Sequence, residues 1–328
     1  MMIKPEKLNP GDKVAIISPA SAVKSEYIDN ACLFLREQGL VPLIMPHAKG
    51  PQCGSYAASR QERLSDFLNV WEDKSIKAVL CGRGGYGVTH LLPDIPDNLL
   101  HDNPKWLIGF SDISALHAAT AKQGIMSVHG PMTRNFNSDD PGVKEIMKII
   151  LEDKLPEYNI VRDNINATLP ANRPGTAQGR LFGGNLAVLN GLAGTPFDMA
   201  NRIAEEDSIL FIEDIAEPIY KVERVLYRLL MQGVLNKIKG LIVGQFTEYR
   251  PSADHSSMES MIENFLEDHD ISDIPVVYDF PCGHIERNMP LVEGAETYLK
   301  VNTTTTELTQ HKPFSDRPAT PPVSVKKN

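Results

Sequence analysis

Ser111 is the residue of this chain best placed to act as a nucleophile. It follows the apolar run 106–110 and stands before a predicted helix over residues 112–122. Such a strand-to-helix turn can lift a serine hydroxyl above the edge of a sheet, and it leaves the first amides of the helix free to stabilise an oxyanion. An alternative without chemistry is that Ser111 is the N-cap of this helix, because serine is preferred there.

An acid and a base occupy similar positions in the second half. Glu213 directly follows the apolar run 209–212, so its carboxylate would be held rigidly and could orient a histidine. Asp214 and Glu217 are interpreted instead as acids favoured at a helix N-terminus. His284 lies in a loop with proline and glycine just after a strand, where a general base is reasonable. The order nucleophile, acid, base matches one known triad arrangement, but order along the chain does not establish proximity.

Nine histidines compete for the role of base. His129, in the segment Val128-His129-Gly130-Pro131, is the main rival of His284. His117 falls inside the predicted helix after Ser111 and is interpreted as structural. The remaining six lie in contexts without suggestive partners.

A glycine-rich segment, Cys81-Gly82-Arg83-Gly84-Gly85-Tyr86-Gly87, follows another predicted strand. Its amides could approach an anion, either a phosphate or a developing oxyanion. No Lys-Ser/Thr pair follows, so it is not a P-loop, and it lacks the placement of a dinucleotide fingerprint. A tight turn between a strand and a helix explains the glycines equally well.

Strand and helix signals alternate through the first half of the chain. Strands are predicted over residues 13–18, 41–46, 77–81 and 105–110, and helices over 25–38 and 59–72. The helices repeat apolar residues at i, i+3, i+4 and i+7, and Ser59 with Glu62 forms a capping box. This alternation predicts an α/β fold with a parallel sheet and helices on its faces.

The pattern weakens into charges, prolines and asparagines between residues 138 and 178, as in a connection between domains. Beyond it, strands are predicted at 208–212, 240–246, 275–280 and 297–301, with an amphipathic helix through Val222, Val225, Leu226 and Leu229. A chain of 328 residues is long enough for two domains. We expect an N-terminal domain over 1–140, a connection over 141–178, a C-terminal domain over 179–310 and a disordered tail over 311–328.

Composition excludes several classes of protein. Hydrophobic residues make up 42% and charged residues 23%, as in ordinary soluble proteins. A formal net charge of -9, without a basic cluster before the last residues, argues against a nucleic-acid partner. The four cysteines form no CxxC pair, which predicts reduced thiols and no zinc site. No signal peptide or membrane-spanning run is evident, so we expect a cytoplasmic protein.

Six motifs follow one another along the chain. They are Gly11-Asp12-Lys13-Val14-Ala15 with Ser18-Pro19, Arg83-Gly84-Gly85-Tyr86-Gly87, Gly109-Phe110-Ser111-Asp112, Gly183-Gly184-Asn185-Leu186, Leu210-Phe211-Ile212-Glu213-Asp214, and Gly283-His284 with Asn288. As an ordered set they resemble the serine-type LD-carboxypeptidases, the murein tetrapeptide carboxypeptidase family, up to about His311. The triad of that family would fall on Ser111, Glu213 and His284. Phe110 stands where tyrosine is common.

The resemblance implies cleavage of the L,D bond before the terminal D-alanine of a murein tetrapeptide, during cell-wall recycling. Ser111 would attack while the amides of Asp112 and of the Gly84–Gly85 turn stabilise the oxyanion. It implies a Rossmann-like N-terminal domain with a smaller β-rich α/β C-terminal domain, and the active site between them. It implies no metal or organic cofactor, no membrane and a homodimer.

The residues that would bind the substrate are less defined. Arg83 or Arg287 could hold the terminal carboxylate, and the family motifs add Tyr86, Asn185 and Asn288 as candidates. A sister branch that resembles microcin C immunity proteins hydrolyses aminoacyl or peptidyl adenylate analogues and is an alternative. Two further alternatives are a non-catalytic protein that binds murein peptides or nucleotides, and a nucleotide-binding module that uses the glycine-rich turn.

Overall fold

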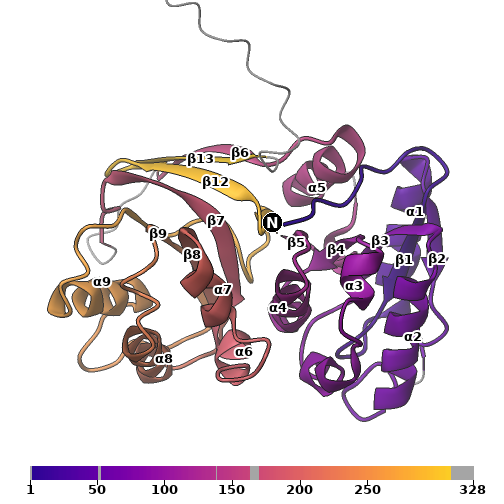
Figure 1. Ribbon diagram of the computed structural model, residues 1–328, viewed down its shortest axis with the longest axis horizontal. Coiled ribbons are helices and arrows are strands. Elements are labelled where there is room, and N and C mark those ends of the chain that lie inside the picture. Colours follow the sequence, from indigo (N-terminus) through magenta and orange to yellow (C-terminus); the bar gives the residue numbers. More distant parts are fainter. Residues whose placement is uncertain (1, 51–52, 138, 163–169, 312–328) are drawn as a thin grey trace, which may run out of the picture.

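A computed structural model describes residues 2–50, 53–137, 139–162 and 170–311. Two β-sheets lie side by side in it (Figure 1). The strands of the first sheet are β1 (Lys13–Ile17), β2 (Val41–Ile44), β3 (Ile76–Cys81), β4 (Trp106–Gly109), β5 (Ser127–His129) and β11 (Leu291–Glu293). Their order is β11-β5-β4-β3-β1-β2, and only β11 runs antiparallel to its neighbour.

Helices accompany this sheet. They are α1 (Ser25–Glu37), α2 (Arg60–Glu72), α3 (Leu99–Asp102), α4 (Ser114–Lys122) and α5 (Pro141–Glu152). Those over residues 25–37, 60–72 and 114–122 lie close to their predicted positions, whereas the helices over 99–102 and 141–152 were not predicted. The predicted capping box is confirmed, because the Ser59 hydroxyl accepts the amide of Glu62 and the Glu62 carboxylate accepts the amide of Ser59. The largely parallel sheet and the helices between its strands confirm the predicted α/β fold class.

The second sheet mixes parallel and antiparallel strands. It contains β6 (Glu157–Val161), β7 (Gly175–Asn185), β8 (Ser208–Ile215), β9 (Gly240–Thr247), β10 (Val276–Val277), β12 (Glu296–Val301) and β13 (Thr305–His311). The order is β10-β9-β8-β7-β12-β13-β6, parallel from β10 to β7 and antiparallel beyond. The helices of this half are α6 (Leu186–Gly191), α7 (Met199–Glu205), α8 (Ile219–Met231) and α9 (Met258–Asp268).

Strand β8 is buried on both faces, which explains its unbroken apolar run. Leu210 and Ile212 join a large buried cluster that also contains residues of the first sheet. Ile209 and Phe211 face a second cluster with strands β12 and β13. The end of β8 is therefore a rigid place from which to present Glu213.

Several elements differ from their predicted bounds. The segment 141–178, expected to be a connection, carries α5, β6 and the start of β7. The strand expected over 275–280 is only two residues long, at β10. The predicted tail after His311 lies outside the described residues.

Strand β11 joins a sheet far from it in sequence. It comes from the second half of the chain, yet it pairs with β5 in the first sheet, with Leu291 opposite His129 and Glu293 opposite Ser127. All four cysteines are free. Among the described helices, none combines the length and the apolar character needed to cross a bilayer.

Candidate active site

Ser111 lies in a strained turn between β4 and α4. Phe110 continues the extended backbone, and Ser111 then adopts a φ of 65°, a left-handed conformation that is uncommon for residues other than glycine. A 3₁₀ turn over Ser111–Ile113 leads into α4, whose N-cap position is Ile113. The alternative that Ser111 serves as the N-cap of the helix is therefore wrong.

The structure brings the three predicted triad residues into one hydrogen-bonded chain. The Nε2 atom of His284 lies 3.0 Å from the Oγ atom of Ser111, although 173 positions separate the two residues. The Nδ1 atom of His284 lies 2.8 Å from Oε2 of Glu213. Because the carboxylate can only accept, it places the ring proton on Nδ1 and leaves Nε2 free to take the proton of the serine hydroxyl.

Glycine backbone closes around the carboxylate of Glu213, which is fully buried. A Cβ atom added at Gly283 would lie 2.8 Å from Oε2 of Glu213. A Cβ atom added at Gly244 would lie 3.2 Å from the Cβ atom of Glu213. The amide of Gly283 also donates to Oδ1 of the buried Asn288 at 2.9 Å, which fixes the loop that carries His284. The Phe110 ring packs against the imidazole, with ring centroids 5.0 Å apart.

The pKa of His284 reflects two opposing influences. Burial lowers it, but the hydrogen bond and the negative charge of Glu213 outweigh burial, so the pKa is raised above its ordinary value. The nearby Asp112 is also buried, and this raises the pKa of its carboxyl to about 6. That carboxylate accepts the amide of Val88 at 2.9 Å and so connects the two turns of the site.

The glycine-rich turn after β3 lies against the nucleophile. A Cβ atom at Gly84 would lie 2.9 Å from Oγ of Ser111 and 3.2 Å from the amide nitrogen of Asp112. Gly85 has a φ of +106° and packs on Ser21. The buried guanidinium of Arg63 holds the far end of the turn by donating to the carbonyl of Gly87 at 2.9 Å. The backbone of Gly84 and the amide of Asp112 thus lie beside Ser111, and their role as oxyanion donors stays a prediction.

The predicted substrate-binding residues have different surroundings. Arg83 is exposed and donates to the carbonyl of Ala22 at 3.2 Å. Tyr86 is exposed, with its ring near Tyr56 and His90. Arg287 is exposed as well.

Asn185 is buried and bonds only within the protein. Its Oδ1 atom accepts the amide of Val188 at 3.1 Å, its Nδ2 atom donates to Asp214 at 2.9 Å, and its own amide donates to Oγ of Ser114. It thereby joins the second sheet to α4 just after the nucleophile. The side chain of Asn288, described above, likewise supports the His284 loop.

Asp214 does contact a helix N-terminus, but that of α6 and not that of the helix after it in sequence. It lies within the buried end of β8, not at the start of the following helix, and it accepts the amide of Ala187 in α6 at 2.8 Å. Burial raises the pKa of its carboxyl to about 6. Glu217 does stand just before α8, where it pairs with Lys221 at 3.3 Å.

His129 is not connected to the nucleophile. Its ring is fully buried, neither ring nitrogen has a hydrogen-bond partner among the described residues, and burial lowers its pKa well below the ordinary value. A neutral ring without a link to Ser111 cannot act as its base. The predicted rival of His284 is therefore not supported.

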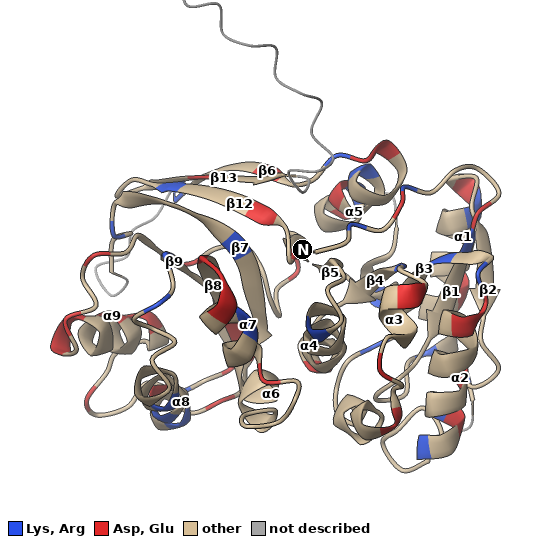
Figure 2. Ribbon diagram, viewed as in Figure 1, with Lys and Arg blue, Asp and Glu red and all other residues tan. Residues whose placement is uncertain are grey.

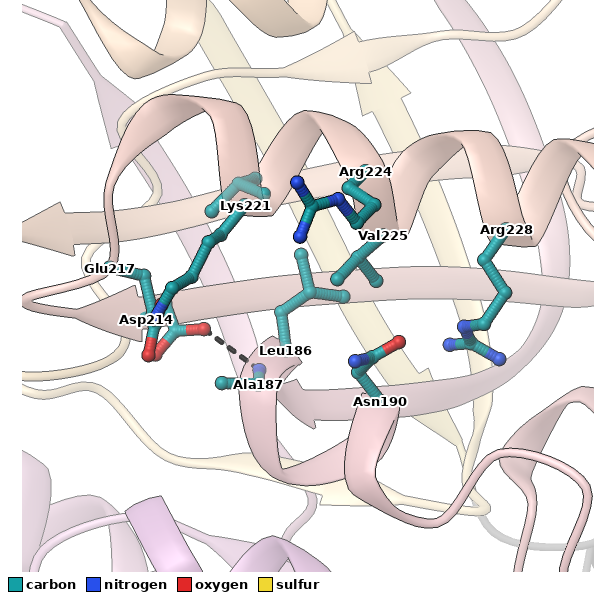
Figure 3. A pocket seen from close by; sticks show the side chains of 10 residues that line it. Leu186, Ala187, Asn190, Asp214, Glu217, Lys221, Arg224, Val225 and Arg228 are labelled. Atoms are coloured by element: carbon teal, nitrogen blue, oxygen red, sulfur yellow. Dashed lines mark hydrogen bonds and ion pairs between the residues drawn. The ribbon is translucent and has the colours of Figure 1, made fainter.

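A cavity of about 420 Å³ lies between α6 and α8 (Figure 3). None of the triad residues lines it, but Asp214, the neighbour of Glu213, does. Basic side chains reach it from α8, the helix that carries blue residues in Figure 2, namely Lys221, Arg224 and Arg228. These residues were not predicted from the sequence. Their spacing of three and four residues places them on one side of α8 beside Val222 and Val225, which also line the cavity, and that spacing was a usable signal.

A hydroxyl, an imidazole and a carboxylate in one hydrogen-bonded chain, with backbone amides beside the hydroxyl, are typical of hydrolases that form an acyl intermediate. Two family models match the chain, the LD-carboxypeptidase N-terminal domain over residues 14–130 and the LD-carboxypeptidase C-terminal domain over residues 178–299. The chain belongs to the LD-carboxypeptidase family. At the level of that family, it is a peptidase.

Similar proteins support this assignment over nearly the whole chain. "Probable murein peptide carboxypeptidase" of Bacillus subtilis (strain 168) is 35% identical over 299 residues, which are 90% of this chain and 91% of the relative. The crystal structure of muramoyltetrapeptide carboxypeptidase from Oxalobacter formigenes has a TM-score of 0.76 at 28% identity, over 92% and 99% of the two chains. The structure of MccF in complex with glutamyl sulfamoyl guanosine has a TM-score of 0.79 at 20% identity, over 94% and 98%, and shows likeness of fold alone.

Replacing Gly84 by alanine should block the nucleophile without unfolding the protein. The new Cβ atom would press on Ser111, so we expect the rate of Ser111 labelling by a fluorophosphonate to fall about 100-fold. Circular dichroism should be unchanged. The matched control is Gly191→Ala, where a Cβ atom meets nothing within 4 Å. Labelling of Gly84→Ala at the wild-type rate would show that the turn does not restrict the nucleophile.

The pH dependence of labelling should report the pKa of His284. Only the neutral imidazole can accept the serine proton, so the rate should rise with pH through a midpoint above the ordinary value of about 6.5. In Glu213→Gln the midpoint should move to lower pH, because the interaction that raises the pKa is lost while burial, which lowers it, remains. Glu248→Gln, which removes a weaker and exposed charge, should shift the midpoint less. An unchanged midpoint in Glu213→Gln would contradict the coupling.

Proposed function

We propose that this chain is a serine LD-carboxypeptidase that removes the terminal D-alanine from murein tetrapeptides. The observation that carries the proposal is the chain of hydrogen bonds from Ser111 through His284 to Glu213. The family assignment and the names of the relatives support a murein peptide as the substrate. The homodimer and the two-domain division stay predictions.

The acylation step uses the tautomer that Glu213 imposes on His284. The Oγ atom of Ser111 attacks the carbonyl carbon before D-alanine while Nε2 of His284 takes the hydroxyl proton. The amides of Asp112 and of the Gly84–Gly85 turn donate to the oxyanion, and one such donor is worth roughly 3 kcal/mol in related chemistry. The imidazolium then gives its proton to the leaving amine, so that D-alanine departs and an acyl ester remains on Ser111.

Deacylation repeats the proton transfers with water as the nucleophile. Nε2 of His284 takes a proton from water, which attacks the ester carbonyl, and the imidazolium returns that proton to Oγ of Ser111. The tripeptide leaves with a new carboxylate. Throughout both steps, the ionised Glu213 stabilises the charged imidazole.

The cavity between α6 and α8 is suited to anionic parts of a peptide. Its volume of about 420 Å³ is within the range of ligand pockets. Lys221, Arg224 and Arg228 outnumber its two acids, Asp214 and Glu217. A murein tetrapeptide carries several carboxylates. These three cations bind them, so recognition of the carboxylates does not require Arg83 or Arg287.

The first test is release of D-alanine from L-Ala-γ-D-Glu-meso-diaminopimelyl-D-Ala, followed by mass spectrometry. Wild type should release it, and Ser111→Ala should retain its fold and lose at least about 10⁴-fold in rate, because the covalent step needs the hydroxyl. Ser272→Ala, at an exposed serine, is the matched control and should match wild type.

Each other outcome contradicts part of the proposal. Turnover by Ser111→Ala would exclude the nucleophile. A folded wild type without turnover would exclude the substrate, and hydrolysis of glutamyl sulfamoyl guanosine would then favour the microcin-immunity activity. Thermal stabilisation by tetrapeptide without turnover of either compound would favour a binding protein.

Neutralising the cavity should weaken substrate binding more than the chemical step. In Arg224→Met we expect KM for the tetrapeptide to rise about tenfold with kcat within about twofold, the pattern of lost uniform binding. Lys237→Met, which removes an exposed cation outside the cavity, serves as the control. An unchanged KM in Arg224→Met would place substrate recognition elsewhere.

A further inference from the structure

Three buried polar side chains outside the triad meet near Phe110. They are His117 of α4, His129 of β5 and Glu293 of β11. The exposed fractions are 0%, 0% and 1%, and one potential ligand atom of each lies within 4.8 Å of the other two. The Phe110 ring contacts both His129, at 6.0 Å between centroids, and His284, at 5.0 Å, but among the described residues the rings of His117 and His129 form no hydrogen bond with a triad residue.

Two of these side chains have unsatisfied atoms. Both ring nitrogens of His129 and both carboxylate oxygens of Glu293 lack a hydrogen-bond partner among the described residues. The amide of Gly183 faces Glu293, but not in the geometry of an ordinary hydrogen bond. Buried polar groups are nearly always paired, and a buried carboxylate without a cation is especially costly. The cluster therefore offers several unpaired donor atoms to a bound cation.

His117 is already oriented as a ligand would be. Its Nε2 atom lies 2.9 Å from the carbonyl oxygen of Gly109, which can only accept, so the ring proton is on Nε2. The Nδ1 atom keeps its lone pair and lies 2.8 Å from Oγ of Ser127. A histidine that binds a metal almost always donates its other N–H to such an acceptor.

We propose that His117, His129 and Glu293 form a buried structural site for a divalent transition-metal ion, with Zn²⁺ the best match to the donors. Two imidazoles and one carboxylate are a known zinc ligand set. The Ser127 hydroxyl now donates to Nδ1 of His117 and accepts from the Thr120 hydroxyl, so a metal ion would take the place of the first of these hydrogen bonds. The ion would neutralise Glu293 and occupy a free nitrogen of His129. The proposal does not depend on the peptidase activity proposed above.

The walls of the cluster point to a closed structural site. The ring of Phe211 lies 5.0 Å from that of His129, and a Cβ atom at Gly184 would lie 3.8 Å from its Nδ1 atom. All three ligand side chains are buried, whereas a catalytic zinc needs an open position that a substrate can reach. The ion would instead join α4 and β5 to β11, the strand that enters the first sheet from the other half of the chain.

The first experiment measures metal in the wild-type protein. Purified protein is analysed by inductively coupled plasma mass spectrometry, dialysed against a chelator and titrated with ZnCl₂ or CoCl₂. We expect close to one Zn²⁺ per chain, a melting temperature that rises by roughly 5 °C on adding Zn²⁺, and a visible Co²⁺ spectrum typical of nitrogen and oxygen ligands. No bound metal, together with no shift by either ion, would overturn the proposal.

The variants locate the ion. Glu293→Gln should lose the metal and the Zn²⁺-dependent shift, whereas Glu259→Gln, at another buried glutamate, should keep both. Ser111→Ala should keep the metal although it loses turnover, so failure of this site and failure of the proposed activity can be told apart. Metal retained by Glu293→Gln would place the ion elsewhere, and Glu293→Gln more stable than metal-treated wild type would show that Glu293 is simply a protonated acid.

Discussion

The structure depends on keeping an ionised carboxylate fully buried beside an imidazole. Glu213 has no exposed surface, and only Oε2 finds a partner, in His284, while Oε1 has none among the described residues. An isolated charge in such a place would cost several kcal/mol, so the pair is stable only as a unit. The strand that presents Glu213 is accordingly rigid and covered on both faces.

The site also requires segments of backbone to pack very close to neighbouring residues. Glycine stands at each of these contacts. A Cβ atom at Gly184 would lie 2.6 Å from Oγ of Ser114, and Gly84, Gly244 and Gly283 meet Ser111, Cys282 and Glu213 just as closely. These positions come from the turn after β3, from β7 and β9, and from the His284 loop. The two sheets can bring their strand ends to one site because no side chain separates the backbones there.

Much of this arrangement could be predicted from local patterns. Apolar periodicity and the Ser59 cap gave the helices of the first half, and the position of each polar residue after an apolar strand singled out Ser111, Glu213 and His284. Strand β7 was missed because Gly179, Gly183 and Gly184 are unfavourable in strands. Glycine is required in this strand because a neighbour that is distant in sequence packs against it. A Cβ atom at Gly183 would collide with the carbonyl oxygen of Phe211. The left-handed Ser111 and the pairing of β11 likewise depend on distant contacts, which no local pattern encodes.

Because β11 is far from β5 in sequence, the first sheet is completed late during synthesis on the ribosome. The helices and the parallel strands around Ser111 are complete once about the first 130 residues have emerged, but the open side of β5 stays uncovered until residues 291–293 follow. The His284 loop lies just before those residues, and its backbone is joined to them through Asn288 and Met289. A growing chain therefore carries Ser111 without its hydrogen-bond partner until late in translation, and His284 arrives with the same segment that closes the sheet.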